Sequence, residues 1–342
     1  MTLPVVPPLD RAAEPALRAL IDAKAKPLGA LGRIETLAIQ LALIAGRPDP
    51  TADRAQLLVF AGDHGLTEAG VSSYPQAVTL AMVATLLAGK ASANAFARAV
   101  GAKVMVVDAG VAADILSHPD LIEAKVRAGT RNGALEPALT LEEVRLALSR
   151  GAAIAAAAAE EADVLLLGEM GIGNSASAAL ILHRLGPAPL AECVGLGAGH
   201  DEAGLARKRA ALDQAAARSS ADQPMEVLAQ FGGLEIAMMA GAVIGAAAAR
   251  RPVVVDGFIC GAAALAAIRL QPAVRDYCVF AHRSAERGHA LMLQVLGAEP
   301  LLDLDLRLGE GTGGLLALPL LRAACALLSD LASLEDVLAG RL

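Results

Sequence analysis

The sequence predicts an α/β protein built on a doubly wound, mainly parallel sheet, and three observations support this class. Short runs rich in branched aliphatic residues recur along the chain without alternating polar residues. Such runs are typical of strands that are buried on both faces. Segments of helical length separate the runs, and each run ends in glycine or a polar residue, as strand-to-helix turns do.

Polar residues at the strand ends are the first candidates for a functional site, because ligands bind beyond the carboxyl ends of the strands in such sheets. Taken one at a time, these residues are equally compatible with ordinary turns. Two segments, 140–161 and 225–249, are expected to be helices. The expected strands are residues 57–60, 104–107, 164–167, 193–194, 253–255 and 278–280.

The length of 342 residues is compatible with one large domain, or with one large and one small domain. Residues 9–46 are expected to form helices interrupted at 26–29, and residues 313–340 are also expected to be helical, with Pro319 near the start of that segment. These two ends could pair as a small satellite domain.

The composition predicts a core of small and branched aliphatic side chains, with helices packed close together. Hydrophobic residues make up 55% of the chain and aromatic residues only 2%. The net charge is −7, and no cluster of basic residues is interleaved with aromatic ones. This pattern argues against a nucleic-acid partner.

Cysteine usage and the N-terminal segment predict a cytoplasmic protein. The four cysteines include no C-x-x-C pair, which argues against a structural zinc site or a disulfide framework. The first residues lack the basic and apolar regions of a signal peptide. The most membrane-like stretch, residues 236–249, is too short to span a bilayer, so no membrane partner is expected.

Residues 168–177 carry three glycines and a carboxylate, Glu169, between an expected strand and an expected helix. Glycines allow the backbone to approach a ligand, and free N–H groups at a helix start favour a phosphate. Asn174 or Ser175 is expected to cap the helix. The segment also fits a loose dinucleotide-binding pattern through Gly171 and Gly173, so an NAD-dependent dehydrogenase is one alternative function.

Residues 307–314 place a second carboxylate, Glu310, among glycines. Such a carboxylate suits general-base catalysis when apolar neighbours raise its pKa toward neutrality. Thr312 is expected to cap the helix that follows. The alternative interpretation is a solvated glutamate in a turn.

Aspartate and histidine side chains at other strand ends suggest a metal-dependent hydrolase as a second alternative. The candidates are Asp63, His64, Asp256 and His282, but no H-x-x-x-H pair occurs, and no metal site is predicted. Lys208 lies in a basic stretch, which is usually a solvated helix face. A nucleophilic hydrolase is not supported, because the chain has no G-x-S-x-G elbow.

Six segments, taken in order, resemble the nicotinate-nucleotide–dimethylbenzimidazole phosphoribosyltransferase family. The resemblance extends over roughly residues 15–335. The segments are residues 26–33, 61–65, 168–174, 256–258, 282–286 and 307–313.

This resemblance implies that the chain transfers the 5-phosphoribosyl group of nicotinate mononucleotide to 5,6-dimethylbenzimidazole, for the lower ligand of cobalamin. It implies a Rossmann-like large domain of residues 47–312 and a small helical domain of residues 1–46 plus 313–342. It also implies a homodimer that needs no metal or redox cofactor. A non-catalytic protein that binds the nucleotide is a third alternative.

The resemblance also implies roles for individual residues. Glu310 takes the place of the catalytic base, and Glu169 that of a second catalytic carboxylate. Two departures from the family pattern are Tyr74, where a small residue is common, and Ala176, where a hydroxyl residue is common. The implied phosphate- and ribose-binding residues are Gly171, Asn174, Ser175, Gly197, Lys208 and Ser284, and the implied base pocket comprises Tyr74, Met82, Met170 and Leu308.

Overall fold

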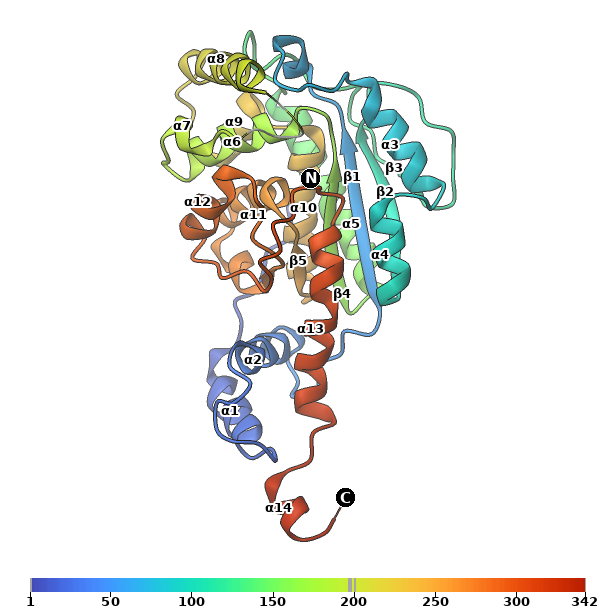
Figure 1. Cartoon of the computed structure of the whole chain (residues 1–342), viewed down its shortest axis with the longest axis vertical. Helices are drawn as coiled ribbons and strands as arrows, with labels where there is room; N and C mark the ends of the chain where they lie inside the picture. The colour runs from blue at the N-terminus through green and yellow to red at the C-terminus, as the bar shows by residue number, and fades with distance from the viewer. Residues whose placement is uncertain (1, 196–198, 200, 342) are drawn as a thin grey trace.

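A six-stranded parallel sheet forms the centre of the protein in a computed structural model that describes residues 2–195, 199 and 201–341 (Figure 1). The strand order is β3-β2-β1-β4-β5-β6, and every neighbouring pair is parallel. This is the strand order of doubly wound dinucleotide-binding folds, so the predicted fold class is confirmed. The strands are β1 (Ala55–Gly62), β2 (Ala102–Gly110), β3 (Leu121–Glu123), β4 (Val164–Met170), β5 (Val253–Val255) and β6 (Cys278–Phe280).

Five of the six predicted strands are present, and the prediction for residues 193–194 is wrong. Cys193 ends a short helix, α7 (Leu190–Cys193), and Val194 follows it. Both side chains are buried, so their apolar character reflects burial and not strand pairing. Strand β3 was missed because its three residues, paired only with β2 at the sheet edge, are too few to produce a pattern.

The predicted helix over 140–161 is confirmed, whereas the one over 225–249 is two helices. Helix α5 (Leu141–Glu161) begins after Thr140, whose hydroxyl accepts a hydrogen bond from the Glu143 amide at 3.1 Å in a capping box. The second segment divides into α9 (Pro224–Phe231) and α10 (Leu234–Ala248). Gly232 and Gly233 between them have extended backbones, which end one helix and begin the next.

Small residues bring α5 and α10 into backbone contact on one face of the sheet. A Cβ atom at Gly151 would collide with the carbonyl oxygen of Met238, and one at Gly241 with that of Leu148. The helices therefore approach as closely as the alanine- and glycine-rich composition predicts. The opposite face is covered by α3 (Ala77–Leu87), α4 (Ser92–Val100) and the first half of α13 (Thr312–Ser329). The remaining helices beside the sheet are α6 (Asn174–Leu185), α8 (Glu202–Arg218), α11 (Phe258–Leu270) and α12 (Arg287–Val295).

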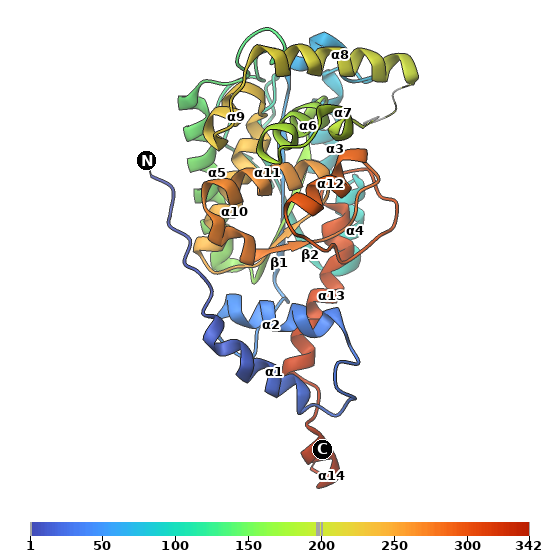
Figure 2. The same ribbon diagram turned by 90° about the vertical axis from the view of Figure 1, so that its left-hand side faces the viewer.

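The helices near the two chain ends pack together below the sheet (Figures 1 and 2). Helices α1 (Glu14–Asp22) and α2 (Arg33–Ala45) pack against α13, and α14 (Leu334–Leu338) follows it. Lys24, which follows α1, donates hydrogen bonds of 2.7 Å from Nζ to the carbonyl oxygens of Leu328 and Leu331. Pro319 lies inside α13, beyond its first turn, so the expectation that it lies near the start of the helix is wrong.

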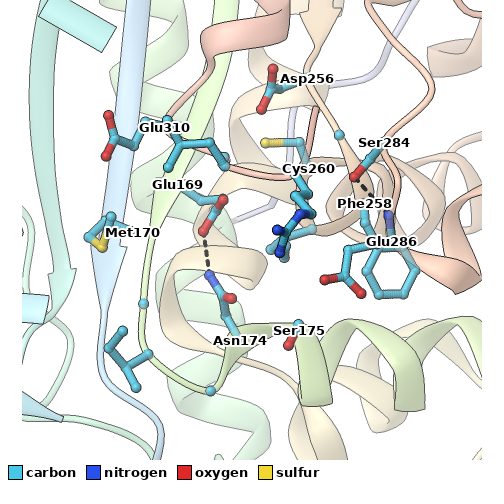
Figure 3. A pocket seen from close by; sticks show the side chains of 18 of the residues that line it. Glu169, Met170, Asn174, Ser175, Asp256, Phe258, Cys260, Ser284, Glu286 and Glu310 are labelled. Carbon is cyan, nitrogen blue, oxygen red and sulfur yellow. Dashed lines mark hydrogen bonds between the residues drawn. The ribbon is translucent and has the colours of Figure 1, made fainter. Parts of the chain in front are cut away.

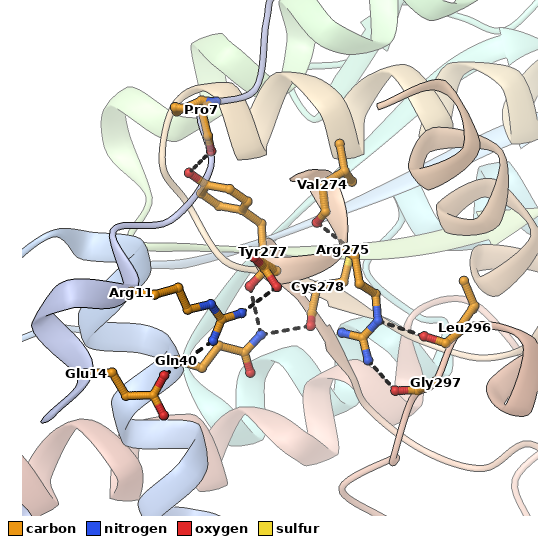
Figure 4. Close-up of polar contacts among 11 residues, drawn as sticks. Pro7, Arg11, Glu14, Gln40, Val274, Arg275, Tyr277, Cys278, Leu296 and Gly297 are labelled. Carbon is orange, nitrogen blue, oxygen red and sulfur yellow. Dashed lines mark hydrogen bonds and ion pairs between the residues drawn. The ribbon is translucent and has the colours of Figure 1, made fainter. Parts of the chain in front are cut away.

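The N-terminal segment is tied to the edge of the sheet near β6 (Figure 4). The buried Tyr277 hydroxyl donates to the carbonyl oxygen of Pro7 at 2.8 Å, and Arg11 pairs with Asp276 at 2.7 Å. Gln40 of α2 donates to the carbonyl oxygen of Cys278 at 3.1 Å. One hydrophobic cluster also joins the terminal helices to the core of the sheet. The division into domains of residues 1–46 plus 313–342 and of 47–312 stays a prediction.

Two apolar stretches, Ala77–Val100 and Thr312–Ser329, are long enough to cross a membrane by length and composition. The first contains two separate helices, α3 and α4. The second is α13, which packs against β4, α2 and α4. Both stretches therefore have an explanation as elements of the α/β fold.

Candidate active site

A cavity of about 380 Å³ opens at the carboxyl ends of β1, β4, β5 and β6. It lies beside the point where the strand order reverses, between β1 and β4, which is where doubly wound sheets bind their ligands. Glu169, Asn174 and Ser175 approach it from β4 and α6, and Glu310 from the loop before α13 (Figure 3). The lining segments are residues within 71–82, 169–175, 256–260, 282–286 and 307–310.

Glu169, near the end of β4, is a buried carboxyl group that is protonated at neutral pH. Burial raises its pKa to about 8, and the negative charges of Asp256, Glu235 and Glu310 act in the same direction. A short hydrogen bond from the Asn174 side chain to Glu169 opposes the shift only in part. Since Asn174 also lines the cavity, the pair presents one ordered polar surface to a ligand.

Glu310 lies in a strained loop and points its carboxylate toward the start of α4. Its φ of 59° is left-handed, between Gly309 at 89° and Gly311 at 82°. A non-glycine residue in this region is energetically unfavourable and is found where the surroundings impose it. The side chain is only 2% exposed, and Oε2 accepts a hydrogen bond of 3.2 Å from the Ala93 amide. The interpretation of Glu310 as a solvated turn residue is therefore wrong.

Burial raises the pKa of Glu310, whereas the hydrogen bond from Ala93 lowers it. The amide belongs to the first turn of α4, where the helix dipole favours a negative charge. The predicted cap at Thr312 is wrong: Gly311 is the N-cap of α13, and the Thr312 hydroxyl donates to the carbonyl oxygen of Gly309 at 2.9 Å. That bond closes the turn that carries Glu310.

Asp256 supports the same loop from β5. Its Oδ1 accepts a hydrogen bond of 2.9 Å from the Gly314 amide, and His282 Nε2 lies 3.6 Å from the same oxygen. Burial raises the pKa of Asp256, and the charge of His282 opposes this shift. Asp256 and His282 therefore hold the start of α13. Among the described residues, no group of three or more His, Cys, Asp or Glu side chains is arranged to hold a metal ion.

The glycine loop before α6 caps this helix differently from the prediction. Gly173, with a φ of 94°, is the N-cap of α6, and neither Asn174 nor Ser175 caps the helix with its side chain. The Ile172 amide donates to the buried Thr79 hydroxyl at 3.1 Å, which ties the loop to α3. Gly171 and Ser175 line the cavity, so the start of α6 faces the cavity.

Lys208 is buried, with 1% of its surface exposed, so the interpretation as a solvated helix face is wrong. Its Nζ donates to the Ser175 hydroxyl at 2.9 Å and lies behind the cavity wall. Burial lowers the pKa of Lys208, and the charge of Glu286 opposes that shift. Ser284 lines the same side of the cavity, and its amide donates to His289 Nδ1 at 2.8 Å. Gly197 lies outside the described residues.

The four side chains assigned to the base pocket, Tyr74, Met82, Met170 and Leu308, all line the cavity. Tyr74 and Leu308 are 49% and 56% exposed, which places them at its mouth. Ala176 is fully buried in α6 and does not line the cavity. The departure at Ala176 therefore removes no hydroxyl group from the cavity wall.

Several lining residues were not predicted from the sequence. Glu286 has a buried Oε2 atom without a hydrogen-bond partner among the described residues and lies beside Ser284 (Figure 3). Glu286 belongs to the segment 282–286, one of the six that carry the family resemblance. Its position shortly after an expected strand could have identified it as a site residue. The apolar lining residues Val71, Val78 and Phe258 carry no such signal, because their residue types are those of any core.

The fold and the cavity define a Rossmann-like α/β protein with a glycine loop at a helix start and three buried carboxyl groups in the cavity wall, those of Glu169, Asp256 and Glu310. A phosphoribosyltransferase family model matches residues 6–338. The chain is 52% identical to nicotinate-nucleotide–dimethylbenzimidazole phosphoribosyltransferase of Cupriavidus necator over 97% of both chains. It is 53% identical to that of Ralstonia nicotianae over 95% of this chain and 93% of the relative.

The crystal structure of CobT from Thermus thermophilus superposes with a TM-score of 0.92 at 44% identity, covering 95% of this chain and 98% of that one. The chain belongs to the nicotinate-nucleotide–dimethylbenzimidazole phosphoribosyltransferase family. It is thus a phosphoribosyltransferase, a pentosyl-transferring enzyme that acts on small molecules. Family membership also argues against the dehydrogenase, hydrolase and non-catalytic alternatives.

Proposed function

We propose that the enzyme transfers the 5-phosphoribosyl group of nicotinate mononucleotide to 5,6-dimethylbenzimidazole, with Glu310 as general base. The products are α-ribazole 5′-phosphate and nicotinate, and the reaction serves the assembly of the cobalamin nucleotide loop. The names of the relatives support both substrates. The observation that carries the role of Glu310 is its buried carboxyl group in the cavity wall, where the Ala93 amide donates to Oε2.

The two carboxyl groups have different surroundings, and this difference separates their roles. At neutral pH the Glu169 carboxyl is protonated, since its pKa is about 8, and the charge of Glu310 contributes to that shift. The Glu310 carboxylate accepts a helix N–H from Ala93, which favours its anion. In a site with two carboxyl groups, the one whose surroundings favour the anion is suited to act as the base.

The reaction needs a base at one point only. The bond between C1′ and the pyridinium nitrogen breaks, and its electron pair returns to the ring, so nicotinate leaves without being protonated. The benzimidazole nitrogen attacks C1′ from the opposite face, which inverts the anomeric configuration from β to α. The other ring nitrogen then carries an acidic N–H, and Glu310 accepts that proton. General-base catalysis of this kind contributes about 10²–10⁴-fold.

The cavity wall combines polar and apolar side chains, as these two substrates require. Ser175, backed by Lys208, and Ser284 offer hydroxyl groups and a cation for a phosphate. Met82 and Leu308 offer an apolar wall for a planar base next to Glu310. Binding both reactants in one cavity supplies the proximity on which bimolecular transfer depends.

Glu169 has a different task in this proposal. As a protonated acid ordered by Asn174, it donates a hydrogen bond to a ribose hydroxyl or to the departing carboxylated ring.

The protein works as a soluble, cytoplasmic homodimer, and no metal or redox cofactor takes part in the transfer.

A chromatographic assay tests the proposal. Purified protein is incubated with nicotinate mononucleotide and 5,6-dimethylbenzimidazole, and α-ribazole 5′-phosphate and nicotinate are quantified together. Stoichiometric formation of both products is the expected result. Absence of any ribosylated product with this base, related benzimidazoles and purines would refute the proposal.

A further inference from the structure

A buried histidine and glutamate, His64 and Glu235, form an ion pair directly beneath the cavity. Both side chains are inaccessible to solvent, and His64 Nε2 lies 2.7 Å from Glu235 Oε1. His64 Nδ1 lies 3.0 Å from the hydroxyl oxygen of Ser177. Neither residue of the pair lines the cavity, so any influence on the ligand passes through other groups.

The pair connects three segments that surround the glycine loop. His64 follows β1, Ser177 lies in the first turns of α6, and Glu235 lies in the first turn of α10. Burial alone would lower the pKa of His64, but the charge and hydrogen bond of Glu235 outweigh it and raise that pKa. The imidazolium form donates one N–H to Glu235 and the other to Ser177.

The pair also fills the space beside the glycines of the loop. A Cβ atom at Gly171 would lie 3.4 Å from Glu235 Oε1, and one at Gly173 would lie 3.5 Å from His64 Cβ. On the other side, a Cβ at Gly62 would lie 2.8 Å from Glu235 Oε2. The two side chains therefore pack beside the backbone that lines the cavity.

A buried ion pair of this kind is not expected to contribute much to the stability of the fold. Glu235 Oε2 is buried without a hydrogen-bond partner among the described residues. Buried ion pairs are often no more stabilising than apolar side chains of the same volume, because desolvation opposes the attraction. What such a pair provides is a fixed geometry, since each charge accepts few alternative partners.

We propose that His64 and Glu235 are positioning residues that hold the Gly171–Asn174 loop and the first turn of α6 in the conformation that binds the phosphoribosyl end of the substrate. This inference rests on the proposed function for the identity of that substrate. In the proposed function the aromatic base binds against other lining residues, Met82 and Leu308. The pair should therefore affect binding of the nucleotide and leave binding of the base unchanged.

The test compares the variants Glu235→Gln and His64→Gln with the wild type. Each amide is close in size to the residue it replaces and keeps one hydrogen bond. We expect KM for nicotinate mononucleotide to rise about 10–100-fold, the effect of displacing a binding group by a fraction of an ångström to about 1 Å. KM for dimethylbenzimidazole should stay within about twofold of the wild type, within the scatter expected for a site that is not perturbed.

Two matched variants at residues that do not line the cavity serve as controls. His183→Gln changes a histidine of α6 that contacts the Ala188 carbonyl oxygen, and Glu143→Gln breaks the ion pair with Arg131. Both should leave the two KM values unchanged, whatever they do to the melting temperature. In the double variant H64Q/E235Q, the loss of binding free energy for nicotinate mononucleotide should be smaller than the sum of the losses in the two single variants, because the pair acts as one unit.

Calorimetric titration with ribose 5-phosphate separates this inference from the proposed reaction. If the wild type forms no α-ribazole phosphate but binds ribose 5-phosphate more tightly than E235Q does, the proposed function fails and the positioning role stands. If the folded variants bind nicotinate mononucleotide and ribose 5-phosphate as the wild type does, the positioning role is refuted. A lower melting temperature with unchanged KM values would likewise show that the pair is only structural.

Discussion

Replacing Glu310 by glutamine removes the proposed proton acceptor and preserves the shape of the side chain. The amide oxygen of the introduced glutamine can still accept the Ala93 N–H that lies 3.2 Å from Glu310 Oε2. The fold should therefore survive, and the change should be confined to the transfer step. The loss of a general base lowers kcat about 10²–10⁴-fold, which corresponds to about 3–5 kcal/mol in the activation barrier.

The pH dependence of kcat strengthens this test. Burial raises the pKa of Glu310 above its ordinary value of 4.5, and only the ionised carboxylate accepts a proton. The rate of the wild type should therefore increase with pH as Glu310 ionises, and this limb should be absent in E310Q. A limb that persists in E310Q near pH 8 belongs to Glu169.

The assay is the chromatographic measurement of α-ribazole 5′-phosphate at saturating concentrations of both substrates. The control is Glu161→Gln, which changes an exposed carboxylate paired with Lys103 at 3.5 Å, where both side chains are 75% exposed. This variant should keep wild-type activity. If E310Q also keeps kcat within about twofold of the wild type, a change far smaller than loss of a general base produces, Glu310 is not the base.

Three further results are expected. Glu169→Gln should raise the melting temperature at pH 8 relative to the wild type, by several degrees, and should change it little near pH 4. The reason is that the folded protein keeps Glu169 protonated up to a pKa of about 8, whereas the unfolded chain ionises this group near pH 4.5. The wild type therefore loses stability as pH rises from 4.5 to 8, and the glutamine variant does not. Equal shifts of the melting temperature at both pH values would contradict this. Gly311→Ala should lower the free energy of unfolding by about 2 kcal/mol or more, because its φ of 82° is strained for alanine and its Cβ would collide with Leu57. Gly101→Ala, at a φ of 67° with open space around it, should cost only about 1 kcal/mol in chemical denaturation, and equal losses would refute the steric argument. Because the pyridinium leaving group needs no Lewis acid, EDTA should leave turnover unchanged, and a loss restored by a divalent metal would overturn the metal-free reaction.

Much of the site was predictable because its residues belong to contiguous motifs at strand ends. Glu169 and Glu310 stand out as carboxylates among glycines, and both line the cavity. Lys208 was misjudged from its neighbours, since Arg207 and Arg209 make the stretch resemble a solvated helix face. Its burial follows from the way α8 packs near α6, and a contact between separate helices leaves no local pattern.

The sequence by itself determined the parallel α/β class, most of the strands and the segments that carry the chemistry. It determined them because burial on both faces of a sheet and backbone freedom at glycines act within a few residues. Only the tertiary structure decided the protonation of Glu169, the pairing of His64 with Glu235 and the anchoring of Glu310 on Ala93. These depend on desolvation and on contacts between residues as many as 217 positions apart, which exist only once the chain is packed.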